Sequence, residues 1–434
     1  MRMRGLSLDV IPPIHIPLRF FLTAPWLGVA AALVLLAGGD PSFRSQWSSE
    51  MLAVTHLLTL GFMVMVMLGA MFQIVPVISG RVIPGGVVIA TLVHLFLLVG
   101  TLLLVTGFYR QNYSLFAWAG PILALAFITF LLALGSLLIR RVGGGDSIFT
   151  IRFAALALLI TVSLGLFRSA NYAGLANSLE LANITNLHLA WGLGGWVVLL
   201  VMGVSYQVIP MFHVTPNYPP LLARALSLVV FVSLLALTFL QQQVAQAMAV
   251  TGLCGGAAAY AIFTFHLISR RKRKVDEITI RFWWLSLGSL LLGALLSAVF
   301  YFFVDTVPAS DVVRRVPVMI GVLMIYGFAI SVIMGMVQKI VPFLSFLHLQ
   351  RRCLGNFELL KTLPHMGNLI SPLRLRWQLR LHVAALLVLM QSAVTGTFVW
   401  VAALLMAADF AWLGITLIKA SWLYRETVLR INAE

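Results

Sequence analysis

Residues 51–78 read MLAVTHLLTLGFMVMVMLGAMFQIVPVI, a stretch that contains no Asp, Glu, Lys or Arg. About 20 apolar residues in a helix cross the roughly 30 Å of hydrocarbon in a bilayer. The backbone must be helical there because lipid offers no hydrogen-bond partners to an exposed peptide group. The stretch therefore predicts a transmembrane helix, in which His56 is the only ionisable side chain.

The rest of the chain has the same character, since 61% of its 434 residues are hydrophobic and 10% are charged. Soluble domains are about a quarter charged, so the composition excludes a soluble protein. We expect an all-α integral membrane protein with one membrane domain over residues 1–434. Hydropathy predicts about twelve transmembrane helices. Their expected bounds are Leu18–Ala37, Met51–Ile78, Val87–Phe108, Leu115–Ile139, Ile151–Phe167, Ile184–Phe212, Leu222–Leu240, Ala247–Ile268, Phe282–Phe303, Val316–Phe346, Leu381–Gly396 and Phe398–Leu423.

The net charge of +16 comes from 29 Lys and Arg residues, most of which fall in loops on one side of the membrane. Basic loops mark the cytoplasmic side, so both termini are expected there, in a multi-pass protein of a bacterial-type inner membrane. The basic run at residues 270–274 is interpreted as a topology signal, so the expected partner is the lipid bilayer and not a nucleic acid. The basic residues assigned to the outer side are Arg44, Arg110, Arg168, Arg314 and Arg315.

A pattern of small and polar residues recurs three times along the chain. Gly-x7-Gly-x3-Gln-x2-Pro begins at Gly61 and at Gly195, and a version with Lys in place of Gln begins at Gly327. The motif prolines at positions 76, 210 and 342 lie 134 and 132 residues apart. We expect three four-helix repeats at approximately residues 18–140, 151–268 and 282–423. An even number of spans per repeat gives them parallel topology, so a pseudo-threefold axis should run along the membrane normal.

Three histidines lie within predicted spans, where an ionisable side chain is costly and indicates a functional site. His56 and His188 are nearly level, and they lie 20 and 22 residues before their motif prolines. Two residues of offset rotate a helical side chain by about 200°, so the two imidazoles should face one another from equivalent helices. Such a pair can ligate a haem iron or another transition metal. His94 lies deeper and is a further candidate ligand.

The other ionisable residues within the membrane offer fewer functional signals. His382 is a candidate counterpart of His94 in its repeat. It is placed in a cytoplasmic segment or at the cytoplasmic end of a helix, as are His15, His213, His266, His348 and His365. Acidic residues are almost confined to loops, with Asp409 the exception. The sequence therefore predicts no chain of carboxylates for proton relay.

The residues His56-x4-Gly61-Phe62-x6-Gly69-x6-Pro76 resemble the histidine-bearing second helix of NnrS-type membrane proteins. More distantly, they resemble that helix in the catalytic subunit of haem-copper oxidases, which also has twelve spans. The resemblance implies a haem-copper oxidase-like fold and a haem- or copper-binding protein linked to nitric oxide. It implies haem of b-type more than c-type, and an electron donor or respiratory-chain partner. By position, His56 corresponds to a low-spin haem ligand, and His188 lies on a helix that supplies a copper ligand.

The chain departs from the oxidase pattern in two helices. The span at 222–240 has no histidine, and the span at 316–346 has none before His348. We therefore expect one haem or metal centre in place of the oxidase binuclear centre. The leading hypothesis is a haem- or metal-binding protein with a redox, sensing or gas-handling role, in which His56 and His188 are metal ligands and His94 a further cofactor-binding candidate. The alternative is a cofactor-free transporter or permease, with a substrate path lined by Gln73, Gln207 and Lys339.

Overall fold

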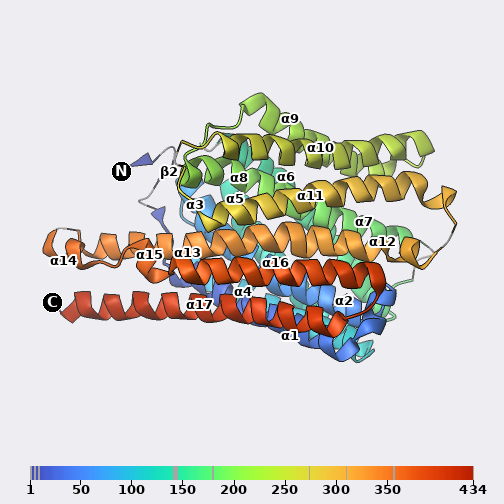
Figure 1. Cartoon of the computed structure of the whole chain (residues 1–434), viewed down its shortest axis with the longest axis horizontal. Helices are drawn as coiled ribbons and strands as arrows, with labels where there is room; N and C mark the ends of the chain where they lie inside the picture. Colours follow the sequence, from blue (N-terminus) through green and yellow to red (C-terminus); the bar gives the residue numbers. More distant parts are fainter. Residues whose placement is uncertain are drawn as a thin grey trace.

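The computed structural model describes residues 2–3, 6–7, 10–139, 145–177, 180–272, 274–308, 310–354 and 357–433. Twelve helical spans in this part of the chain are long and apolar enough to cross a membrane, which confirms the predicted number and class. Both termini lie at one end of the bundle, as an even number of spans requires (Figure 1). One residue of the predicted basic run, Arg273, lies outside the described residues.

The helices follow one another along the chain in three sets of four spans. The first set comprises α1 (His15–Gly38), a composite helix of α2 (Ser49–His56), η3 (Leu57–Val64) and α3 (Met65–Ser79), then α4 (Gly86–Tyr109) and α5 (Ser114–Leu138). The second comprises α6 (Gly145–Tyr172), a composite of α7 (Leu181–Leu189), η4 (Ala190–Val197) and α8 (Val198–His213), then α9 (Pro220–Phe239) and α10 (Gln243–Ser269). The third comprises α11 (Ile278–Phe303), a composite of α12 (Asp311–Gly321), η6 (Val322–Ile330) and α13 (Ser331–Arg352), then α16 (Pro372–Thr395) and α17 (Val399–Ala433).

Short elements complete the chain and lie between or beside the spans. They are β1 (Arg2–Met3), which pairs antiparallel with β2 (Leu6–Ser7), together with η2 (Asp40–Arg44), η5 (Val304–Thr306), α14 (Phe357–Thr362) and α15 (Met366–Leu369).

The eleventh span begins nine residues earlier than predicted, at Pro372 instead of Leu381. Ser371 caps the helix because its side chain accepts a hydrogen bond from the backbone N–H of Arg374, and Pro372 occupies the first helical position. The basic side chains of this first part can extend towards water while their stems cover apolar surface. Basic residues that indicated a loop therefore belong to the helix, which places His382 three turns inside it.

The motif glycines make equivalent contacts in all three units. The second glycine of each motif lies against the first helix of its own unit. A Cβ added there would lie 2.6 Å from a partner atom in the first and third units and 3.0 Å in the second, so a larger residue would force the neighbouring helix or side chain to shift. The recurrence supports the internal repeat, while the pseudo-threefold axis stays a prediction. The pairs are Gly69 with Phe20, Gly203 with Ile151 and Gly335 with Phe282.

A π-helical segment interrupts the second span of each unit at a matching place. These segments are η3, η4 and η6, and each contains the first motif glycine of its unit. Fewer than 1% of residues in globular proteins are π-helical, and such segments are frequent at functional sites. The motif helices are therefore the first place to look for function.

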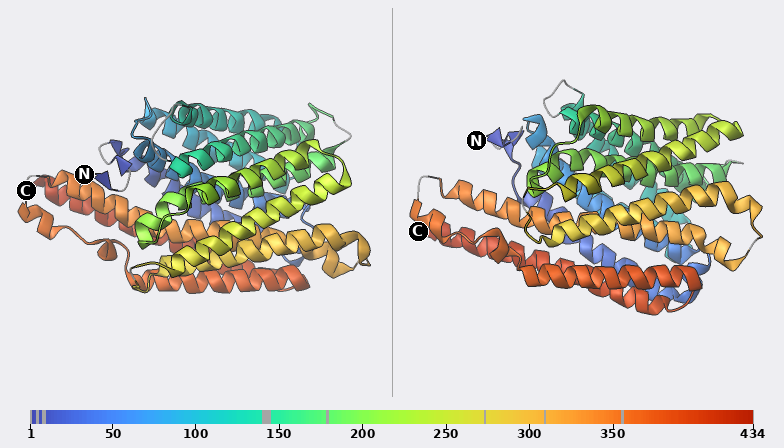
Figure 2. Two further views of the ribbon diagram at one scale, coloured as in Figure 1. Left: turned by 90° about the horizontal axis from the view of Figure 1, so that it is seen from above. Right: turned by 45° about the horizontal axis from the view of Figure 1, so that its top comes forward.

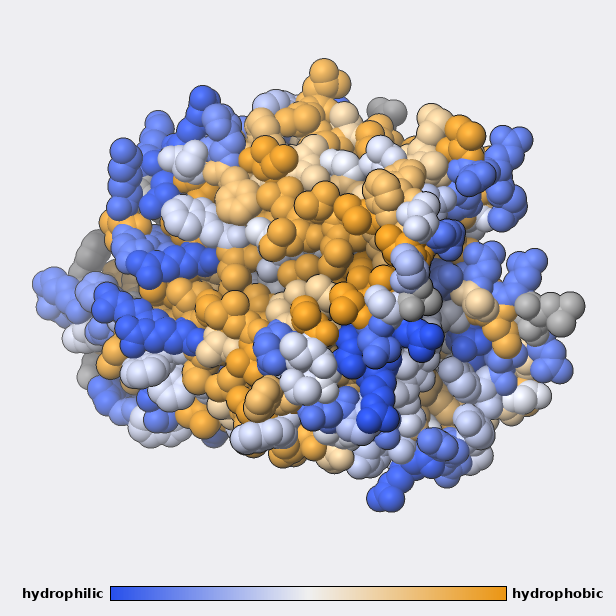
Figure 3. All heavy atoms as spheres, turned by 45° about the vertical axis from the view of Figure 1, so that its right-hand side comes forward, coloured by the Kyte–Doolittle hydropathy of each residue, from blue (hydrophilic) through white to orange (hydrophobic). Residues whose placement is uncertain are grey.

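The surface and the helix directions fit a membrane protein. Figure 2 shows the long helices running side by side, with the chain ends at one end of the bundle. Apolar side chains dominate the middle of the face in Figure 3, and hydrophilic ones gather towards its ends. Large apolar side chains such as Leu132 of α5 are exposed on outward faces, where lipid would cover them.

Candidate functional site

A cavity of about 830 Å³ lies between the three units. Its walls are mostly apolar, and every unit contributes to them, with His56 from the first, His188 from the second and Tyr326 from the third. Trp47 and Asp305, which follow odd-numbered spans, also line the cavity. It therefore reaches the end of the bundle opposite the chain termini. Cofactor and ligand sites commonly have volumes of about 300–1,000 Å³.

The imidazoles of His56 and His188 lie together in this cavity. Their ring centroids are 6.5 Å apart and the ring planes differ by 17°. His56 ends α2 directly before the π-helix η3, and His188 lies in α7, two residues before η4. The two imidazoles therefore lie close together and nearly parallel, on the second spans of the first two units.

Backbone carbonyls fix the orientation of both rings. Nδ1 of His56 is 2.8 Å from the carbonyl oxygen of Leu52, and Nδ1 of His188 is 2.9 Å from that of Thr161. A carbonyl can only accept, so Nδ1 carries the hydrogen in each ring, and Nε2 keeps its lone pair. Within the described part of the chain, neither Nε2 makes a hydrogen bond and neither ring contacts a carboxylate.

Each ring also packs closely against one neighbouring residue. His56 stacks on Phe108 of α4, with centroids 5.1 Å apart. His188 lies over Gly165 of α6, where an added Cβ would be 2.9 Å from its Cε1 atom. Gly165 therefore leaves the space that the His188 ring fills. One turn further along α6, Arg168 lines the cavity and donates a hydrogen bond to the hydroxyl of Tyr172.

His94 does not join this pair. On α4, its Nε2 is 2.9 Å from the hydroxyl of Thr23, and its ring meets Phe20 edge-on at 5.1 Å. It does not contribute to the cavity wall. No group of three or more His, Cys, Asp or Glu side chains among the described residues is placed to hold a metal ion. A metal site at His56 and His188 would thus have two protein ligands.

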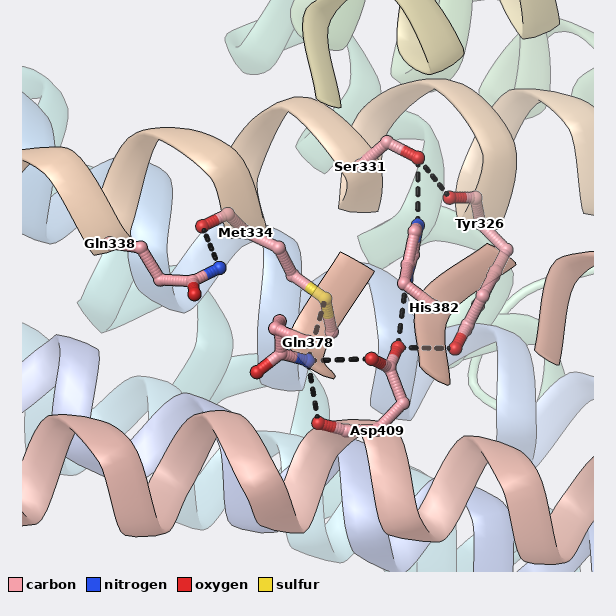
Figure 4. A network of polar contacts seen from close by, with 7 residues as sticks. All are labelled: Tyr326, Ser331, Met334, Gln338, Gln378, His382 and Asp409. Atoms are coloured by element: carbon pink, nitrogen blue, oxygen red, sulfur yellow. Dashed lines mark hydrogen bonds and ion pairs between the residues drawn. The ribbon is translucent and has the colours of Figure 1, made fainter. Parts of the chain in front are cut away.

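His382 lies in a very different place from the one predicted. Instead of marking a cytoplasmic end, it is fully buried in α16, and its Nδ1 is 2.8 Å from Oδ2 of the equally buried Asp409 of α17 (Figure 4). The hydroxyl of Tyr326 donates to the same oxygen at 2.6 Å, and Nε2 of Gln378 donates to Oδ1 at 2.6 Å. The prediction missed this network because it placed His382 at the cytoplasmic end of its span. The signal was present in Asp409, a carboxyl in the middle of an apolar helix.

Lys339, the residue that breaks the motif symmetry, is engaged in an ion pair. Its ammonium is 3.0 Å from Oε2 of Glu277, which precedes α11, and Nδ1 of His213 is 3.4 Å from the same oxygen. The neighbouring His213 imidazole and then the Lys339 ammonium lower the pKa of Glu277 from its ordinary 4.5 to about 2. Glu277 is therefore ionised at neutral pH and links the second unit to the third.

Comparison with known protein families and with curated proteins finds no match to this chain.

Proposed function

We propose that this protein binds a haem or a transition metal between His56 and His188 and has a redox, sensing or gas-handling role in the membrane. One observation carries the proposal: two nearly parallel imidazoles lie 6.5 Å apart in a mostly apolar cavity, each held through Nδ1. Metal-binding histidines commonly donate their second ring N–H to a carbonyl, which fixes the ring and raises the basicity of the other nitrogen.

The distance between the two rings and the volume of the cavity also fit a bound metal ion or haem. Metal–imidazole bonds are about 2.0–2.1 Å long, so two such bonds and two ring radii span roughly the observed separation of the ring centroids. The cavity of about 830 Å³ has room for a planar prosthetic group as well as for a single ion. Arg168 places a positive charge on its wall, where a carboxylate of a bound group could pair with it.

The cysteines favour b-type over c-type haem. Covalent attachment requires a C-x-x-C-H motif, whereas this chain has two cysteines, Cys254 and Cys353, far apart in sequence. A copper ion held by the two imidazoles is the other form of the proposal. Either group, when bound, would supply one-electron chemistry or binding of a diatomic gas. An electron donor or respiratory-chain partner and a link to nitric oxide, implied by the NnrS-type and oxidase-like resemblance, belong to this proposal.

The transporter alternative has less support. It required Gln73, Gln207 and Lys339 to line a common path. The Lys339 ammonium instead pairs with Glu277, and Gln73 is buried with 7% of its surface exposed. We therefore do not propose transport.

The test is an absorption spectrum of the detergent-purified protein, oxidised and after dithionite reduction, with haem quantification and metal analysis on the same sample. We expect near-stoichiometric haem or metal in the wild type and in His94→Ala, which removes a membrane histidine outside the cavity. His56→Ala and His188→Ala should each lose the bound group while keeping the helical content. Full occupancy in both of these variants would exclude the proposal.

A further inference from the structure

The buried network around Asp409 contains no Lys or Arg among the described residues. Its net charge is therefore set by how many protons its members carry. Asp409, His382 and Gln378 have no exposed surface, and Tyr326 has 2%. An uncompensated carboxylate at such a place is strongly unfavourable. Among the described residues, the ion-pair partner of Asp409 is His382, so only a proton on this pair can balance the charge.

The remaining neighbours are polar but not charged, or they are apolar. From α16, Gln378 donates to both Oδ1 and the main-chain oxygen of Asp409. From η6, the Tyr326 ring stacks on His382 with centroids 4.7 Å apart. From α11, Phe282 packs against His382 at 5.6 Å. The groups that can titrate here are therefore Asp409, His382 and the Tyr326 phenol.

The network can exist in two protonation states without moving a heavy atom. Oγ of Ser331 is 2.8 Å from Nε2 of His382 and 3.3 Å from the main-chain oxygen of Tyr326. When the Ser331 hydroxyl donates to Nε2, the His382 Nδ1–H donates to an ionised Asp409, as in a Ser-His-Asp arrangement. When Oδ2 of Asp409 carries an additional proton, it can donate in turn to the Tyr326 oxygen, and the hydrogen bonds of His382 stay in place. The two states differ by one proton on the carboxyl.

The network also reaches the cavity. Tyr326 lines the cavity wall while its hydroxyl donates to Asp409. Met406, one turn before Asp409 on α17, lines the same wall. Ser331 and His382 do not, so nucleophilic attack by Ser331 has no route to a substrate, whereas proton transfer through Tyr326 has one.

We propose that Asp409 and His382 form an intramembrane proton-binding site that exchanges its proton with the cavity through Tyr326. In uptake, the Tyr326 hydroxyl passes its hydrogen to Oδ2 of Asp409 and takes a replacement from water in the cavity. The new Oδ2–H then donates to the Tyr326 oxygen, while the His382 Nδ1–H and the Ser331 hydroxyl keep their hydrogen bonds. One proton enters, and the pair changes from net negative to neutral.

Proton uptake by the purified protein in lipid vesicles tests this, with pH stepped over roughly pH 8 to 5, where histidine-linked groups titrate. We expect the wild type to take up one proton more than Asp409→Asn, and infrared difference spectra to show the Asp409 carboxyl change that Asp409→Asn lacks. His94→Phe, which removes the matching histidine of the first unit, should behave as the wild type. Equal uptake by the wild type and Asp409→Asn would overturn the site.

Two further variants test the site if Asp409→Asn does not fold. Ser331→Ala keeps the acid and the imidazole, so it should take up the same single proton as the wild type and show the same infrared carboxyl change. Tyr326→Phe should keep the single proton but slow its exchange at least about tenfold. Loss of the proton in the first variant would refute Asp409 as its acceptor, and an unchanged rate in the second would refute the cavity route. Neither readout depends on a bound haem or metal.

Discussion

Replacing Gly165 with Ala is the sharpest test of how the chain positions His188. The added Cβ would lie 2.9 Å from Cε1 and 3.3 Å from Nδ1 of the imidazole, whereas ordinary contacts begin at 3.4 Å. The ring must therefore withdraw by about 0.5 Å, which disturbs its hydrogen bond to the Thr161 carbonyl. Metal–ligand bond lengths vary by only about 0.2 Å, which is less than the expected displacement of the ring. Loss of an orienting partner typically costs 10–100-fold in metal affinity, and we expect a loss of this size.

The assay is a titration of the cofactor-depleted protein with haem or with the metal found in the native sample, followed by visible absorption. Gly321→Ala is the matched control, because Gly321 lines the same cavity and an added Cβ would meet nothing within 4 Å. Wild-type helical content and unfolding midpoint in Gly165→Ala would show that weaker binding comes from the displaced ring and not from unfolding. Wild-type affinity in Gly165→Ala, or an equal loss in Gly321→Ala, would refute the proposed role of Gly165.

Two predictions concern stability. The pKa of Glu277 is depressed in the folded state, from 4.5 to about 2, so its contribution is present above pH 4.5 and is lost as the pH falls towards 2. Glu277→Gln should therefore lower the free energy of unfolding by at most about 3 kcal/mol at pH 7, and the gap should shrink by about 1.4 kcal/mol per pH unit in that window. A difference in unfolding free energy between the wild type and Glu277→Gln that does not change with pH would contradict this. Gly69→Ala should destabilise the protein by about 1–3 kcal/mol through contact with Phe20. Gly255→Ala, which has open space around it inside α10, should not destabilise the protein. Equal unfolding midpoints of the two variants would speak against tight packing at Gly69.

The spans were predictable because membrane insertion depends on local composition. Twelve apolar stretches of sufficient length are visible without any knowledge of their packing. The error at the eleventh span has a physical reason: Arg374, Arg376 and Arg380 lie within a capped helix. Averaged hydropathy cannot distinguish basic residues in a helical extension from basic residues in a loop.

The polar network could not be predicted because its members come from three separate helices. Asp409 and His382 are 27 residues apart, and Tyr326 is 83 residues from Asp409. Sequence alone marks Asp409 as unusual in an apolar helix. That it meets a histidine, a tyrosine and a glutamine depends on how α16, α17 and η6 pack together, which no local pattern encodes.

The histidine pair was predicted from ideal helical rotation, although the helices that carry it are not ideal. The π-helices η3 and η4 both lie between the histidine and the motif proline of their span. Each π-helix changes the rotation between the histidine and the proline by a similar amount. The difference in ring direction between the two helices therefore still follows from the two-residue offset. In the third unit, the positions 22 and 20 residues before Pro342 are Ile320 and Val322, so η6 has no matching ligand there. That unit instead carries the Asp409 and His382 pair, and Tyr326 of η6 joins it to the shared cavity. The same helical interruption thus positions an imidazole in two units and a phenol in the third, which is why a repeated scaffold can carry two unlike sites.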